Sequence, residues 1–268
     1  MLLPFTKAHG TGNHFIIIYL PDCPELEINE TLIKLLCNPN TGIGADGLLA
    51  ISIDKKYDFK MDYYNNDGSW ETMCANGARC AALFLYEKKI IDKHATFISG
   101  DGSHKIKIHN KNNVELTIFP PKYTSKEIII DEYSGFSINS GAKHFIVEID
   151  SSVNLNWKSI GKKIRNSNHF YPDGTNVNFV KKISNNSIEV ITYEKGIEAI
   201  MQSCGSGSVA AAYHMQKKYN LNNNIHVKVP GGELLITTDS NWSEVWLRGQ
   251  AQLIFKSIID IGVILNET

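Results

Sequence analysis

An internal repeat with a spacing of 130 residues limits the possible folds most strongly. A cysteine precedes a small-polar-glycine turn and an alanine-rich run at residues 74–82 and again at 204–212, so that Cys204 follows Cys74 by 130 residues (204 − 74). The same spacing carries residues 14–17 onto 144–147 and the turn 100–102 onto 230–232. Matches in a single register indicate a tandem duplication, and a repeat of about half the chain predicts two domains of similar fold.

Both halves show the same order of expected elements. Each begins with an apolar strand and a helix with an asparagine N-cap, Asn29 or Asn156, and each ends with a helix after its cysteine and further strands. The helix after Cys74 carries apolar side chains on most faces, which is typical of a buried helix. The expected strands cover residues 14–20, 48–53, 59–64, 105–109, 114–119, 143–149, 177–181, 188–193 and several runs within 225–255.

These patterns predict an α+β protein with two pseudo-symmetric domains, each a mostly antiparallel sheet wrapped round a central helix. We expect residues 1–125 to form the half that carries Cys74, and residues 126–268 the half that carries Cys204. An active site is expected in the cleft between the halves.

Composition narrows the possible partners. The net charge of −1 and the charged fraction of 21% give no basic excess for nucleic acid, and no stretch is long enough for a membrane helix, so we expect a small-molecule substrate. The five cysteines are odd in number and irregularly spaced, and the N-terminus does not resemble a signal peptide. We therefore expect reduced thiols and a cytoplasmic location.

A cysteine at the start of a helix is in a position that can change the acidity of its thiol. Unpaired N–H groups and the helix dipole favour negative charge there, so the thiol pKa of Cys74 and of Cys204 is expected to fall toward neutrality. The N–H groups of residues 75–77 and 205–207 can hold a carboxylate. If the duplicated halves face each other, a thiolate on one side of a carbon and a thiol on the other can exchange a proton with inversion.

Other roles for the cysteines remain open at this point. Cys23, Cys37 and Cys80 are expected to be buried apolar side chains, which is the usual state of a free cysteine. A zinc site finds no support in the ligand spacing, and no metal or cofactor is expected. A redox disulfide between Cys74 and Cys204 is possible, although exchange chemistry usually uses closely spaced cysteines.

The motifs together resemble those of the diaminopimelate epimerase family, over nearly the whole chain. The stretches that carry the resemblance are residues 9–15, 42–49, 65–69, 74–80, 141–144, 174–179, 193–196, 204–207 and 230–232. The resemblance implies a cofactor-independent isomerase that interconverts LL- and meso-diaminopimelate in lysine biosynthesis, and dimers are known in the family. By the same resemblance Cys74 and Cys204 are the acid/base thiols, assisted by His144 and Glu194. The residues implied in substrate binding are Asn13, Asn65, Ala75, Asn76, Asn176, Glu194, Lys195, Gly205 and Ser206.

Some of these residues have simpler explanations when taken singly. A histidine on a strand such as His144 is more often structural, Glu194 before a glycine is typical of a solvated turn, and asparagines beside glycine turns often serve the turn itself. The chain also departs from the family at Lys195, where arginine is usual, and at Ala142, where many members have asparagine. A racemase for a different amino acid and a non-catalytic binding relative therefore remain alternatives.

Overall fold

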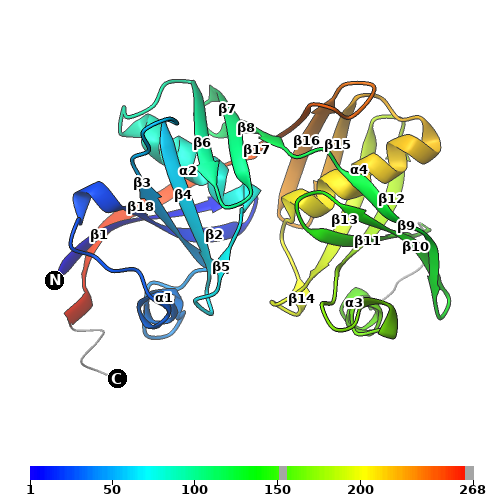
Figure 1. The fold of residues 1–268 in the computed structure, drawn as a ribbon, viewed down its shortest axis with the longest axis horizontal. Helices are drawn as coiled ribbons and strands as arrows, with labels where there is room; N and C mark the ends of the chain where they lie inside the picture. Colours follow the sequence, from blue (N-terminus) through cyan, green and yellow to red (C-terminus); the bar gives the residue numbers. More distant parts are fainter. Residues whose placement is uncertain (151–155, 263–268) are drawn as a thin grey trace. The chain divides into compact units, whose positions relative to one another are not determined.

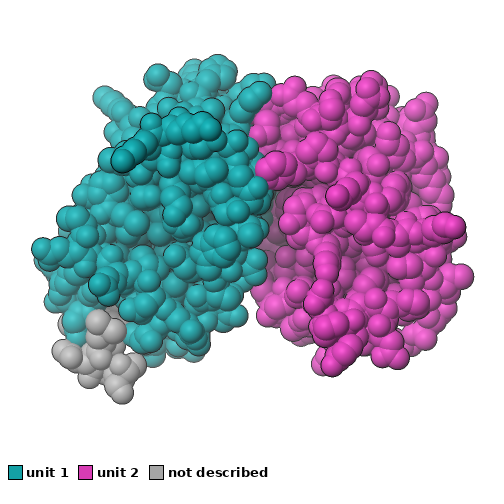
Figure 2. All heavy atoms as spheres, in the orientation of Figure 1, with its two compact units in different colours: residues 1–116, 249–268 teal, residues 117–248 magenta. Residues whose placement is uncertain are grey.

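The chain divides into two compact units that differ from the predicted halves. The computed structural model describes residues 1–150 and 156–262 (Figure 1). Residues 1–116 and 249–268 form unit 1, and residues 117–248 form unit 2 (Figure 2). The C-terminal segment, expected in the second half, belongs to unit 1 because strand β18 (Gln252–Asp260) pairs antiparallel with β1 (Leu2–Gly10).

Unit 1 is a mostly antiparallel sheet that, in its described residues, carries the helices α1 and α2. Parallel pairing occurs between β2 and β3 and between β4 and β6, while β1–β2, β3–β4 and β6–β7 are antiparallel. Its other elements are β2 (Asn13–Tyr19), η1 (Leu20–Asp22), α1 (Glu30–Cys37), β3 (Gly47–Ser52), β4 (Phe59–Asn65), β5 (Trp70–Glu71), α2 (Ala75–Glu87), β6 (His94–Ser99), β7 (Gly102–Asn110) and β8 (Asn113–Ile118), of which β8 crosses into unit 2.

Unit 2 repeats this plan around its own helix. Pairing is parallel between β11 and β12 and between β13 and β15, and antiparallel between β9 and β10, β10 and β11, and β12 and β13. Its elements are β9 (Lys122–Ile130), β10 (Tyr133–Asn139), β11 (Lys143–Glu148), α3 (Trp157–Arg165), η2 (Asn168–Phe170), β12 (Asn176–Ser184), β13 (Ser187–Glu194), β14 (Ala199–Ile200), α4 (Gly205–Tyr219), β15 (Asn224–Val229), β16 (Gly232–Thr238) and β17 (Val245–Gln250), which crosses into unit 1.

The register of one parallel strand pair in each unit repeats with the spacing of the sequence. In unit 1 Phe15 pairs with Gly47, and in unit 2 Phe145 pairs with Val177, each residue 130 positions later. In the next pair of strands the register differs by two residues, because Leu49 lies opposite Tyr63 whereas its equivalent, Phe179, lies opposite Ile191. A one-residue slip would turn every side chain to the other face of the sheet, but a shift of two residues keeps each side chain on its face. The shared register of the two parallel pairs supports the predicted duplication.

The central helix of each unit lies in its core. Every residue of α2 from Ala75 to Leu85 is buried, and α4 buries its alanine run together with Val209 and Met215. Small side chains permit this, since a helix surrounded by apolar strands must be apolar on most faces. The α+β prediction with a central helix in each half is confirmed.

The shorter helices also begin where the sequence predicts. Asn29 accepts a hydrogen bond from the Leu32 amide at 2.9 Å, and Asn156 accepts one from the Ser159 amide at 3.2 Å, so both are N-caps. Helix α1 packs its apolar side against the strands of unit 1 and ends at Cys37. Across the described residues, no helix is both long and apolar enough to cross a membrane.

Candidate active site

Cys74 lies at the N-terminus of the buried helix of unit 1. It is the N-cap residue of α2 and is partly exposed, whereas the residues that follow it are buried. Its sulfur lies 3.9 Å from Oδ1 of Asn13, at the start of β2. The same oxygen accepts a hydrogen bond from Nδ2 of Asn76 at 3.2 Å. Three of the predicted residues, from two distant stretches of sequence, therefore meet in one group.

This group is braced from both sides by charged residues that the sequence did not single out. Asp46 accepts a hydrogen bond from Asn13 Nδ2 at 2.7 Å. Arg79, which is fully buried, donates to Asn76 Oδ1 at 2.8 Å and to Thr11 Oγ1 at 3.0 Å. Burial lowers the pKa of Arg79 to about 10, so the guanidinium stays charged at neutral pH. The sequence signal for the Arg79 contacts was an arginine one turn into an alanine-rich helix.

Cys204 occupies the equivalent position in unit 2 but is more deeply buried. It is the N-cap residue of α4, with 8% of its surface exposed. Its sulfur lies 3.7 Å from Oγ of Ser206. Burial, followed by the charge of Glu194, raises the pKa of the Cys204 thiol well above its usual value, although the Gly207 amide and the Ser206 hydroxyl act to lower it.

The predicted fall in the thiol pKa is therefore wrong for Cys204. The prediction counted the helix terminus, whose amide does act in the expected direction. It left out the loss of hydration around a nearly buried sulfur and the nearby carboxylate, and both of these disfavour the thiolate. Cys204 is a thiol until its proton has an acceptor.

His144 belongs to the same group as Cys204 and contacts it through Ser206. The imidazole is fully buried on β11, and burial lowers its pKa to about 3, so it is neutral at physiological pH. Its Nε2 lies 3.0 Å from Oγ of Ser206 and its Nδ1 lies 3.0 Å from Nδ2 of Asn178. Thr192 donates a hydrogen bond to Oδ1 of Asn178 at 2.8 Å. Neither Asn178 nor Thr192 was predicted as a site residue. The alternating Asn176-Val177-Asn178 was the signal, because alternate strand residues share a face.

The remaining predicted residues of unit 2 stand at or beside the ends of strands, or in the first turn of α4. Asn176 begins β12, and its Oδ1 accepts a hydrogen bond from the backbone amide of Lys195 at 2.8 Å. Glu194 ends β13 and acts on Cys204 by its charge and by a hydrogen bond. The Lys195 side chain is exposed, and its charge acts on Asp173. Gly205 and Ser206 form the first turn of α4, as Ala75 and Asn76 do in α2.

Asn65 is bonded to residues of its own strand and of the turn that follows it. It ends β4, accepts a hydrogen bond from the Tyr63 hydroxyl at 2.7 Å and donates to Ser69 Oγ at 3.1 Å. These bonds fix the turn after β4, as expected for an asparagine beside a glycine. The role of Asn65 in substrate binding stays a prediction.

The cysteines expected in the core are buried there. Cys23, Cys37 and Cys80 are all buried and unpaired with another cysteine. Burial raises the pKa of Cys37 and of Cys80 to about 12, so these thiols are unreactive at neutral pH. Within residues 1–150 and 156–262, no cluster of three or more His, Cys, Asp or Glu side chains is arranged to hold a metal ion.

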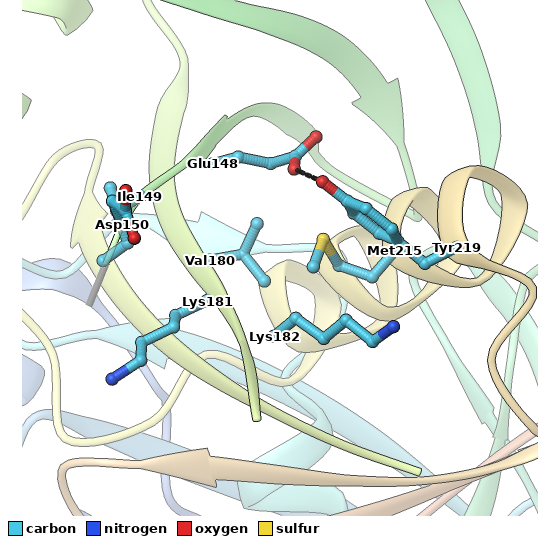
Figure 3. A pocket seen from close by; sticks show the side chains of 8 residues that line it. All are labelled: Glu148, Ile149, Asp150, Val180, Lys181, Lys182, Met215 and Tyr219. Carbon is cyan, nitrogen blue, oxygen red and sulfur yellow. Dashed lines mark hydrogen bonds between the residues drawn. The ribbon is translucent and has the colours of Figure 1, made fainter. Parts of the chain in front are cut away.

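A separate pocket on unit 2 involves none of the predicted residues. Figure 3 shows this cavity of about 180 Å³, where Glu148 from β11 accepts a hydrogen bond from the Tyr219 hydroxyl at 2.5 Å. His214 and Lys218 donate to the same carboxylate at 2.8 and 2.7 Å. Because the acidic group is already satisfied by three donors, we assign this cluster a structural role that ties α4 to β11.

Solved structures share this fold at low sequence identity. A probable proline racemase from Agrobacterium radiobacter matches with a TM-score of 0.74 and 14% identity, over 97% of this chain and 93% of that one. A phenazine biosynthesis protein from Bacillus anthracis matches with a TM-score of 0.72 and 11% identity, over 97% and 99% of the two chains. At these identities the likeness describes the fold alone.

Sequence comparison is more specific. A diaminopimelate epimerase of Flavobacterium psychrophilum is 38% identical over 259 residues, which cover 94% of this chain and 98% of the relative. One from Aquifex aeolicus is 34% identical over 270 residues, which cover 95% and 96%. The family model for diaminopimelate epimerase matches residues 5–123 and again residues 136–254, one match for each repeat. The chain, with its duplicated helices and their N-terminal cysteines, belongs to the diaminopimelate epimerase family.

Proposed function

We propose that this chain interconverts LL- and meso-diaminopimelate by inverting one α-carbon, with Cys74 and Cys204 as the acid/base pair. The observation that carries the proposal is that each thiol is the N-cap of the central helix of its own repeat, at positions 130 residues apart. The relatives named diaminopimelate epimerase support the choice of substrate. The proposal also places the enzyme in lysine biosynthesis and in the cytoplasm, and includes a homodimer.

The chemistry requires one thiolate and one thiol on opposite sides of the carbon. The thiolate removes the α-proton, the thiol supplies a proton from the other side, and the two exchange roles in the reverse direction. The first-turn amides of α2 and α4 are suited to hold the substrate carboxylate, on which negative charge grows as the proton leaves. No pyridoxal group is required in this scheme, because the amides supply the charge stabilisation.

Glu194 gives the buried Cys204 a partner for its proton. The carboxylate forms a hydrogen bond with the Cys204 thiol and acts on it by charge. When the proton moves to Glu194, the Ser206 hydroxyl and the Gly207 amide remain to stabilise the thiolate. Glu194 thus acts in the protonation cycle of Cys204, whereas Lys195 is proposed to attract the distal carboxylate of the substrate.

Solvent isotope exchange tests the proposal directly. The enzyme in deuterated water should introduce deuterium at the α-carbon of LL- or meso-diaminopimelate while interconverting the isomers. Cys74→Ala and Cys204→Ala should each lower interconversion by about 10²-fold or more, while Cys80→Ala, at a buried thiol on α2, serves as the matched control. Full interconversion by Cys204→Ala would rule out the two-thiol mechanism.

A second test asks whether the two thiols can face one carbon. Mild oxidation should join Cys74 and Cys204 in a disulfide, found by peptide mass mapping, with loss of activity that a reductant restores. Cys23 should stay reduced under the same conditions and serves as the internal control. Absence of the Cys74–Cys204 peptide after complete inactivation would contradict facing thiols.

A different amino-acid substrate is the second candidate, favoured by one observation. Lys195 is exposed and unlike the arginine usual in the family, and an ammonium lacks the planar fork with which arginine binds a carboxylate. A panel of amino acids followed by α-deuterium incorporation separates the candidates. Exchange with another amino acid and none with diaminopimelate would assign a racemase of that substrate, and binding with no exchange would assign a non-catalytic relative.

A further inference from the structure

Three buried side chains behind Cys204 form a continuous hydrogen-bonded chain with the partly exposed Ser206. Thr192 Oγ1 donates to Asn178 Oδ1 at 2.8 Å, and Asn178 Nδ2 faces His144 Nδ1 at 3.0 Å. His144 Nε2 then faces Ser206 Oγ at 3.0 Å, and that oxygen lies 3.7 Å from the Cys204 sulfur. The members come from β13, β12, β11 and α4, which pack together in unit 2 (Figure 1).

The direction of each hydrogen bond follows from the groups involved. An amide nitrogen can only donate, so His144 Nδ1 must accept from Asn178 and the ring proton must sit on Nε2. The Nε2 proton is then donated to Ser206 Oγ. The Ser206 hydroxyl, which accepts from His144, keeps its own proton to donate, and the sulfur of Cys204 lies 3.7 Å away, where it can accept that proton as a thiolate.

We propose that Asn178 and Thr192 are positioning residues that fix the tautomer of His144, and thereby make Ser206 a hydrogen-bond donor to the thiolate of Cys204. Neither residue contacts the sulfur; they act through His144 and Ser206. The proposal deepens the proposed function, on which it rests for the catalytic use of the thiolate. It assigns His144 the role of a neutral relay that sets hydrogen-bond direction.

Burial and backbone geometry hold this chain in place. Asn178 and His144 are fully buried, and Thr192 is 3% exposed, so water does not replace their hydrogen bonds. Ser140 Oγ donates to the backbone oxygen of Ser206 at 2.8 Å and fixes the first turn of α4. Glu194 is the charged group that acts on Cys204, and it opposes the thiolate that Ser206 supports.

Unit 1 shows that the arrangement is not a general consequence of the fold. The position equivalent to Asn178 is Leu48, an apolar residue that is fully buried in the core of unit 1. The sulfur of Cys74 lies 3.9 Å from the side-chain oxygen of Asn13. The buried polar chain that runs through Asn178 therefore has no equivalent at the Leu48 position of unit 1.

Two substitutions test the proposal without using the substrate. Asn178→Asp keeps the shape but turns the donor into an acceptor, so the His144 proton should move to Nδ1 and the Ser206 hydroxyl should turn toward Nε2. Nitrogen-15 NMR reports the tautomer, with the His144 signals assigned from a His144→Gln sample. Alkylation of Cys204 at pH 8, measured by peptide mass, should fall about tenfold, the equivalent of about one pKa unit.

Thr192 supplies the matched pair of controls. Thr192→Val removes the donor that orients the Asn178 amide and should also slow alkylation of Cys204, whereas Thr192→Ser keeps the hydroxyl and should keep the wild-type rate. If Asn178→Asp does not fold, the Thr192 pair still decides the matter. Alkylation of Cys74 in the same samples should not change, because it lies in unit 1.

The outcomes separate this inference from the proposed function. A wild-type His144 proton on Nδ1, or an unchanged Cys204 alkylation rate in Thr192→Val, would overturn the relay. A relay that responds as described, in an enzyme that exchanges no α-proton of diaminopimelate, would leave the relay standing and reject the substrate. In the active enzyme, Thr192→Val should lower kcat with little change in KM, whereas Thr192→Ser should keep a kcat close to that of the wild type.

Discussion

Gly207 and Gly77 occupy equivalent positions in the two repeats, and we expect the same substitution to destabilise the protein much more at Gly207 than at Gly77. A Cβ at position 207 would lie 2.2 Å from Oδ1 of Asn178 and 3.3 Å from the sulfur of Cys204. A Cβ at position 77 would lie 2.7 Å from a methyl group of Leu49 and 3.6 Å from Cβ of Cys74. The first obstacle is an amide tied into a hydrogen-bonded chain, and the second is the end of a flexible apolar side chain.

The energetic difference follows from what has to move. In Gly207→Ala, Asn178 must give up its bonds to His144 and Thr192, at about 1 kcal/mol each plus about 1–3 kcal/mol for buried groups left without partners. Alanine returns about 1 kcal/mol of helix propensity, so we expect a net loss of roughly 2–4 kcal/mol in the free energy of unfolding. In Gly77→Ala the same helix gain offsets a mild overpacking by Leu49, and the change should stay within about 1 kcal/mol.

Urea unfolding separates the two variants. Three of the four tryptophans, Trp157, Trp242 and Trp246, belong to unit 2 and Trp70 belongs to unit 1, so tryptophan fluorescence reports mainly on the unit that holds Gly207. Far-UV circular dichroism follows both units and covers Gly77→Ala. Equal stability of Gly207→Ala and the wild type, or an equal loss in both variants, would show that the Asn178 amide is not held as described.

Three further predictions concern other buried or bonded groups. Arg79→Met should lower the free energy of unfolding by roughly 3–5 kcal/mol in urea titrations, because it leaves buried acceptors without a hydrogen-bond donor. Arg79→Lys should recover part of this loss, and no loss in either variant would contradict a structural role for the guanidinium. Burial acts to raise the pKa of Glu148, but hydrogen bonds from His214, Lys218 and Tyr219 lower it to about 2. The stabilisation is therefore present above the unfolded pKa of about 4.3 and is lost as the pH falls toward 2. Glu148→Gln should be less stable than the wild type at pH 7, and thermal melts should show this difference shrinking as the pH falls through that range. A difference that stays constant with pH would refute the assignment. Asn29→Ala should cost about 1 kcal/mol through loss of the cap on Leu32, and unchanged thermal stability would argue against the cap.

The fold was predictable because its strongest signals are local and occur twice. Asn29 and Asn156 mark helix starts, the alanine runs mark the buried helices, and the common spacing joins them into repeats. The pairing of the terminal strands was not predictable in the same way. Nothing local in residues 252–260 indicates that they pair with residues 2–9, because the two strands lie at opposite ends of the sequence and their pairing depends on the tertiary structure.

The site was predictable where residue type and motif agree, and less so where burial decides. Cys74 and Cys204 stand at helix starts as expected. The pKa direction of Cys204 went wrong because depth below the surface cannot be read from spacing. Asn178 and Arg79 were missed for a related reason: a polar residue in an apolar run has meaning only when its partners, distant in sequence, are known.

The pairing of β18 with β1 also sets an order of events during synthesis. Unit 2 is continuous from residue 117 to 248, whereas unit 1 needs residues 249 onward to complete its sheet. The whole of unit 2 therefore leaves the ribosome before the partner strand of β1 exists. We expect the inserted unit to fold first, while the edge of β1 stays open and dependent on protection against misassociation until the last strand arrives.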